Sequence, residues 1–216
     1  MDLVDLVTER TTAATDAVLA LAAAAAILVL RRTTPASFGR AVWQGAFAAL
    51  TLASVLGAVA HGLELPRATR ELLWQPLYLA LGVTMALFVV GAVRDWRGEA
   101  AGRRVLLPML GLALVFYGIT RLTGGSFLAF VVYEAAALLF SLGVYLRLAT
   151  GPARVGAAPM AAALAVSLAA GAVQASGVGP VRLVWDFDHN GVFHLVQLVG
   201  VALLVTGLRR LLASTA

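Results

Sequence analysis

The chain of 216 residues is 61% hydrophobic and only 12% charged, whereas a soluble domain is closer to half apolar and a quarter charged. It has no cysteine, which excludes disulfides, thiolate metal sites and cysteine nucleophiles. All sixteen basic residues are arginine, which excludes lysine-based covalent chemistry. The arginines fall in short pairs between apolar runs, so we expect no nucleic-acid partner.

Seven apolar segments follow one another along the chain, and each is long enough to cross a hydrocarbon core of about 30 Å. Glycine and proline lie mainly in the connections, as turns require. The segments cover residues 15–30, 41–63, 73–93, 105–119, 127–145, 155–175 and 190–208. The sequence therefore predicts one domain, residues 1–216, that is an all-α integral membrane protein, a seven-transmembrane helix bundle surrounded by the lipid bilayer.

The arginines also predict an orientation, because cytoplasmic loops carry an excess of them. With the N-terminus outside, the eleven arginines of the inner segments are Arg31, Arg32, Arg40, Arg94, Arg97, Arg103, Arg104, Arg147, Arg154, Arg209 and Arg210. The five of the outer segments are Arg10, Arg67, Arg70, Arg121 and Arg182. We therefore expect a cell-membrane protein with its N-terminus outside and its C-terminus in the cytoplasm.

Polar side chains gather in the outer halves of these predicted helices, and all three histidines lie at that level. Two helical faces stand out by their spacing. They consist of Ser54, Gly57, His61 and Glu64 on the second segment and of Asn190, His194 and Gln197 on the seventh. Polar groups in lipid are costly unless they face partners or a water-filled cavity. We therefore expect these faces to turn toward each other and form an outward-facing polar site.

The other segments supply further polar groups at the same level. These supporting residues are Asp16, Gln75, Tyr78, Tyr117, Arg121 and Glu134. Glu134 lies roughly two turns, about 10 Å, inside its segment. An isolated ionised carboxylate there would be costly, so we expect it to be neutral or paired. Arg121, Tyr117 or a histidine are its candidate partners.

One function for this site is metal-dependent hydrolysis. Histidines from two helices at one depth can bind zinc and leave a position for a water that the metal acidifies. In this hypothesis His61, His194 and His189 hold zinc. The acids that would orient a ligand or act as general base are Glu64, Asp186 and Asp188. Alternatively, Asp186 and Asp188 are ordinary loop residues, and Asp188 or Asn190 is the N-cap of the seventh helix.

The layout resembles the seven-transmembrane hydrolase superfamily, which contains alkaline ceramidases, adiponectin-receptor-like proteins and haemolysin-III-like proteins. The match is carried by His61 at the end of the second segment, by His189 and His194 at the start of the seventh, and by an acidic N-terminus with Asp16. The resemblance implies zinc and a lipid amide or ester substrate. The chain departs from the pattern in its H-x4-H spacing, in Gly57 where the family has Ser, and in lacking the family's Asp on the third segment.

Two other functions stay open for the same residues. A polar cup with histidine and a buried Glu134 can bind a small polar ligand or relay protons. Because histidine titrates near neutral pH, a proton-linked transporter or sensor without a metal is the second hypothesis. The third is a haem b protein with His61 and His194 as axial ligands.

Overall fold

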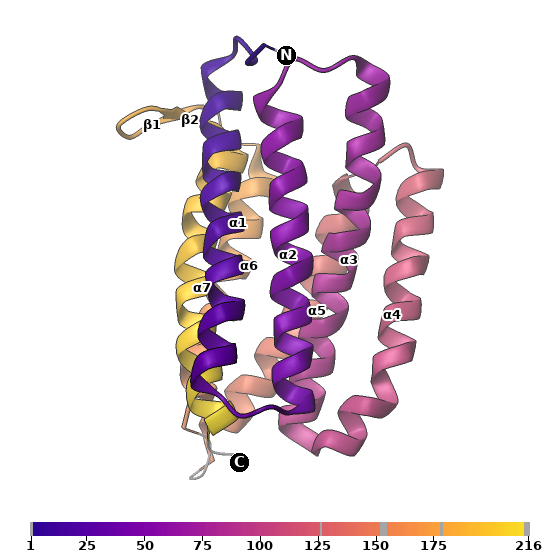
Figure 1. The fold of residues 1–216 in the computed structure, drawn as a ribbon, viewed down its shortest axis with the longest axis vertical. Helices are drawn as coiled ribbons and strands as arrows, with labels where there is room; N and C mark the ends of the chain where they lie inside the picture. The colour runs from indigo at the N-terminus through magenta and orange to yellow at the C-terminus, as the bar shows by residue number, and fades with distance from the viewer. Residues whose placement is uncertain (1, 126, 152–154, 178, 214–216) are drawn as a thin grey trace.

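The computed structural model describes residues 2–125, 127–151, 155–177 and 179–213, and Arg154 of the inner set lies outside them. Figure 1 shows a bundle of long helices with a small hairpin at one end. The helices are α1 Val7–Thr33, α2 Phe38–Gly62, α3 Arg67–Arg97, α4 Glu99–Leu122, α5 Phe127–Ala149, α6 Ala157–Ser176 and α7 His189–Ala213. The strands are β1 Val181–Arg182 and β2 Asp186–Phe187.

Within the described residues the seven predicted helices are confirmed, and each is long and apolar enough to cross a membrane. Most of them run past their apolar segments. Segment 73–93, for example, lies inside α3, which continues to Arg97. Helical hydrogen bonding does not stop where polar residues begin, so hydropathy alone underestimates helix length. The apolar part of each helix still matches the thickness of the hydrocarbon core, which about twenty helical residues span.

The segment before α7 is not the plain loop that the sequence predicts. β1 and β2 pair antiparallel, with Val181 opposite Phe187 and Arg182 opposite Asp186. The hydroxyl of Thr11 on α1 donates to the backbone carbonyl of Asp186 at 2.8 Å. This hydrogen bond ties the hairpin to the start of α1, at the end of the bundle where the N-terminus lies (Figure 1).

Six helices form a closed ring, in which α1, α2, α3, α5, α6 and α7 each pack on the next and α7 returns to α1. Helix α4 lies outside this ring and packs mainly against α3, at the edge of the bundle in Figure 1. Its outer face exposes apolar side chains such as Leu107 and Leu114. In a membrane these side chains would face lipid.

The half of the ring near the C-terminus is a packed apolar core. Trp43, Tyr145, Met160, Leu204 and Leu208 are fully buried there. Small residues let the helices approach closely, as in other membrane bundles; a β-carbon added at Gly91 would lie 2.6 Å from the Trp43 ring. This core closes the bundle at one end, where it also buries the ion pair of Arg94 and Asp95 and the Tyr145 hydroxyl that donates to Asp95. The histidines lie in the other half, near the N-terminus.

Candidate functional site

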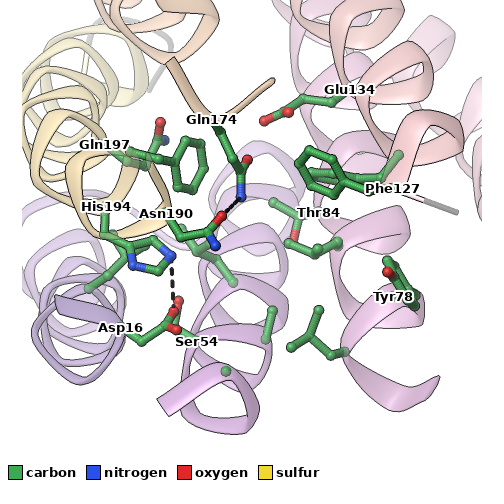
Figure 2. Close-up of a pocket in the computed structure, with 18 of the residues that line it drawn as sticks. Asp16, Ser54, Tyr78, Thr84, Phe127, Glu134, Gln174, Asn190, His194 and Gln197 are labelled. Atoms are coloured by element: carbon green, nitrogen blue, oxygen red, sulfur yellow. Dashed lines mark hydrogen bonds and ion pairs between the residues drawn. The ribbon is translucent and has the colours of Figure 1, made fainter. Parts of the chain in front are cut away.

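A cavity of about 430 Å³ lies inside the ring, in the half of the bundle near the N-terminus. Its volume is that of a pocket for a small molecule. Figure 2 shows polar side chains reaching into it from several helices. The polar and ionisable residues of its lining are Asp16, Ser54, His61, Tyr78, Thr84, Glu134, Gln174, His189, Asn190, His194 and Gln197. The remaining lining is aliphatic or aromatic, so the cavity combines an apolar body with a few polar groups.

Asp16 and His194 form a buried pair on one wall of this cavity. The Nε2 atom of His194 lies 3.3 Å from Oδ1 of Asp16, and the two residues are only 7% and 4% exposed. The other ring nitrogen, Nδ1, lies 3.0 Å from the hydroxyl of Thr15. Figure 2 draws the contact with Asp16 across the cavity edge. Both ring nitrogens of His194 therefore already have protein partners.

The order Thr15, His194 and Asp16 has the residue types of a nucleophile, base and orienting acid. Asp16 and His194 line the cavity, but Thr15 does not belong to its lining. The Thr15 hydroxyl also donates to the backbone carbonyl of Thr12 at 2.9 Å. A nucleophile must reach its substrate, and Thr15 does not reach the cavity. We therefore interpret Thr15 as a residue that orients His194 and not as a nucleophile.

Gly57 explains how the Asp16 carboxyl fits beside α2. A β-carbon at this position would lie 2.6 Å from Oδ2 of Asp16, which is closer than van der Waals contact allows. The absence of a side chain therefore makes room for the carboxyl between α1 and α2. The departure from the hydrolase pattern at Gly57 thus has a steric reason.

His61 also lines the cavity but has a different acidic partner. Its Nδ1 atom lies 2.6 Å from Oε2 of Glu9, and its ring meets the Trp74 ring edge-on at a centroid distance of 5.6 Å. The sequence analysis missed Glu9, because α1 begins at Val7 and the predicted segment began at residue 15. The sequence did contain a signal for Glu9, because an acidic residue is favoured in the first turn of a helix.

The hydrogen-bond partners of His194 determine whether its ring could bind zinc. A zinc-bound histidine uses one ring nitrogen for the metal and the other for a hydrogen bond, whereas His194 uses both for Asp16 and Thr15. Among the described residues no group of three or more His, Asp or Glu side chains lies close enough to hold a metal ion. Zinc binding by His194 would require it to give up one of these two contacts, and the predicted ligand set His61, His189 and His194 stays a prediction.

The three predicted catalytic acids do not line the cavity. Glu64 is exposed beyond the end of α2, and Asp186 is part of β2. Asp188 instead caps α7, because its Oδ1 atom accepts a hydrogen bond from the backbone N–H of Gly191 at 2.7 Å. The same oxygen accepts from the Thr12 hydroxyl at 2.7 Å. The N-cap interpretation of Asp188 is thus confirmed.

The predicted supporting residues divide into two groups. Tyr78 lines the cavity and donates its hydroxyl to the carbonyl of Gly125 at 2.9 Å. Gln75, Tyr117 and Arg121 are not part of the lining. Arg121 is exposed at the end of α4, because α4 lies outside the ring.

Glu134 and Gln197 reach the cavity from α5 and α7, together with Gln174 from α6. Gln197 donates to the Ser167 hydroxyl at 3.1 Å, and Gln174 donates to Oδ1 of Asn190 at 3.0 Å (Figure 2). Within the described ranges Glu134 has no ion pair or hydrogen bond, so the pairing with Arg121 or Tyr117 expected above is wrong. The sequence analysis also missed Gln174, a lone amide in the last turns of the sixth segment.

Comparison with known proteins gives a family but no further relatives. No curated protein and no solved structure matches the chain. A family model matches residues 11–213, a range that runs from the first turns of α1 to the end of α7 and includes the hairpin. That family is described only as one of unknown function, so it assigns no activity to the cavity. The match covers nearly the whole chain, and the protein therefore belongs to the family of unknown function DUF6962.

Proposed function

We propose that this protein spans a membrane seven times and binds a small amphipathic molecule in the cavity of its outer half, as a ligand sensor. The observation that carries the proposal is the cavity of about 430 Å³ enclosed by six helices. Ligand sites in helical bundles have this form, with mostly apolar walls and a few polar groups that fix orientation. The lining of this cavity has both the apolar walls and the few polar groups.

The walls of the cavity support a ligand with an apolar body. Leu77, Leu81, Met85 and Phe88 of α3 contribute to one side of it. A lining of this kind gains free energy when apolar surface leaves water, at about 25 cal/mol per Å². The polar groups stand at the edges, with Asp16 and His194 on one side and Glu134 on another (Figure 2).

The closed half of the bundle favours sensing over transport. Below the cavity the ring is filled by fully buried side chains, Trp43, Met160, Leu204 and Leu208 among them. A carrier needs access to its site from both sides of the membrane in turn. The packed floor of this conformation supports a protein that takes its ligand from one side.

The orientation in this proposal rests on the arginines. The last turns of α1, α3, α5 and α7 carry Arg31, Arg94, Arg147 and Arg210 respectively, and these helices all end on the side of the C-terminus. Basic residues favour the cytoplasmic side. The cavity, in the opposite half, would then face outward.

A screen of small amphipathic compounds against the purified protein in detergent tests this function. A ligand that binds only the folded state raises its stability by about 2.7 kcal/mol at a hundred times its dissociation constant, which is readable as a rise in unfolding temperature. Ser54→Phe, in the cavity wall, should abolish the rise. Leu52→Phe, two residues away on the exposed face of α2, is the matched control and should retain it. Stabilisation that both variants keep would refute binding in the cavity.

The zinc hydrolase hypothesis has a separate test. Metal analysis of the purified wild type should find no stoichiometric zinc if His194 keeps Asp16 and Thr15 as partners. Stoichiometric zinc that is lost in His61→Ala and in His194→Ala would restore that hypothesis and require these contacts to rearrange.

A further inference from the structure

Glu134 is a buried acid without a protein partner. Its residue is 7% exposed, and in the described part of the chain its carboxyl takes part in no ion pair or hydrogen bond. It lines the main cavity and also a second cavity of about 170 Å³ between α5 and α6. Figure 2 shows its carboxyl directed into the main cavity. A buried charge without compensation is strongly destabilising, so this carboxyl is either neutral or paired with a group from outside the protein.

The amides near Glu134 offer acceptors. Ser167, Gly171 and Gln174 are spaced i, i+4 and i+7 on one face of α6, and a β-carbon at Gly171 would lie 3.4 Å from Oε2 of Glu134. Gln174 and Gln197 each donate through the amide nitrogen. Their Oε1 atoms are buried and have no hydrogen-bond partner in the part of the chain that the structure describes. A buried acceptor of this kind is rare in a native protein and calls for an explanation.

Two hydroxyl donors of the cavity are already used. The Tyr78 hydroxyl donates to the carbonyl of Gly125, and the Thr84 hydroxyl donates to the carbonyl of Ala80. The Glu134 carboxylate and the two amide oxygens, by contrast, accept hydrogen bonds. A ligand that pairs with these three groups must donate.

The charge and the aromatic content of the lining agree with a cation. The described lining contains two acids and no arginine, and two of its histidines, His61 and His194, already pair with carboxylates. Six aromatic residues contribute to the walls: Trp74, Tyr78, Phe88, Phe127, Phe130 and Phe193. The faces of aromatic rings attract ammonium groups, and more strongly when water is excluded.

We propose that the ligand is a hydrophobic primary ammonium compound whose nitrogen is held by the Glu134 carboxylate and whose apolar body lies among the aromatic side chains. A primary ammonium has three N–H donors and no acceptor, so it can donate to the Glu134 carboxylate. This inference rests on the proposed binding function and adds the charge class of the ligand.

Three probes of nearly equal shape test it: 4-phenylbutylamine, 4-phenylbutanol and 4-phenylbutanoate. Titration calorimetry on the purified full chain in detergent should show the ammonium binding at least tenfold more tightly than the alcohol, with no binding of the carboxylate. Glu134→Gln keeps the shape and removes the charge, so the ammonium should bind roughly 10- to 100-fold more weakly, as the loss of a charged hydrogen bond predicts. Binding of the alcohol should change less than about threefold.

Glu99→Gln is the matched control, because Glu99 is a surface acid that pairs with Arg103 at the other end of the bundle. It should leave all three affinities unchanged. The comparison of the three probes on the wild-type protein needs no variant. It therefore tests the inference even if Glu134→Gln fails to fold.

Two outcomes would overturn the inference, and they differ in their meaning. If the alcohol binds as tightly as the ammonium and Ser54→Phe abolishes both, the ligand is not a cation but the binding function stands. If no probe binds, or if Ser54→Phe leaves binding unchanged, the binding function fails as well.

Discussion

The buried contact between Asp16 and His194 joins α1 to α7 and closes the helix ring. We expect Asp16→Ala and His194→Ala each to destabilise the bundle, because each leaves a buried polar partner unsatisfied. The contact can be isolated from the effects of the two truncations by a double-mutant cycle, in which the double variant is compared with the sum of the single ones.

The expected loss of unfolding free energy follows from the burial of the two side chains and the distance between them. Removing one partner from a buried charged pair costs about 3–5 kcal/mol, and leaving a neutral buried donor or acceptor unpaired costs about 1–3 kcal/mol. The separation of 3.3 Å between Nε2 and Oδ1 is longer than the 2.7–2.9 Å typical of a strong charged hydrogen bond. His194 also keeps Thr15 as a partner. We therefore expect about 2–3 kcal/mol for each single variant and a coupling of about 1–2 kcal/mol.

Equilibrium unfolding in mixed micelles, followed by circular dichroism, measures these free energies. The exposed i,i+4 pair of Glu99 and Arg103 provides the control cycle, and its coupling should stay below about 0.5 kcal/mol because solvent screens it. If the losses from Asp16→Ala and His194→Ala add without coupling, the two side chains do not interact in the folded bundle, and the proposed closure of the ring by this contact is refuted.

Three further substitutions test the packing around the site by the same unfolding measurement. Gly57→Ala should cost about 1–2 kcal/mol, because the clash with the Asp16 carboxyl outweighs the gain in helix propensity; a neutral or stabilising effect would place that carboxyl elsewhere. Asp188→Ala should cost about 0.5–2 kcal/mol by removing the N-cap of α7, whereas Asp188→Asn should retain most of it. Gly82→Ala should cost about 1–3 kcal/mol, because a β-carbon there would lie 2.8 Å from the Phe116 ring, and an unchanged stability would contradict the packing of α4 on α3.

The helices could be predicted from the sequence because each one contains a run of apolar residues long enough to cross a membrane. The ends were less predictable, since α1 begins eight residues before its predicted segment, at Val7. That extension brings Glu9 beside His61. The hairpin of β1 and β2 was missed, because two strands of two residues give too short a pattern to recognise.

The membership of the site could be predicted in part, but its pairings could not. Periodicity placed His61, His194 and Gln197 on inward faces, and all three line the cavity. Which acid meets which histidine depends on the order of helices around the ring, and this order is not encoded in the spacing along one helix. Arg121 was expected beside Glu134 for the same reason, but α4 lies outside the ring.

An experimental structure of the protein in lipid nanodiscs with 4-phenylbutylamine would show whether an ammonium ligand is held at Glu134 inside the helix ring. We expect the nitrogen of the probe about 2.7–3.2 Å from a carboxyl oxygen of Glu134, with the phenyl ring inside the cavity. A cavity without the probe, or a probe bound only on the lipid-facing surface of the helices, would contradict it.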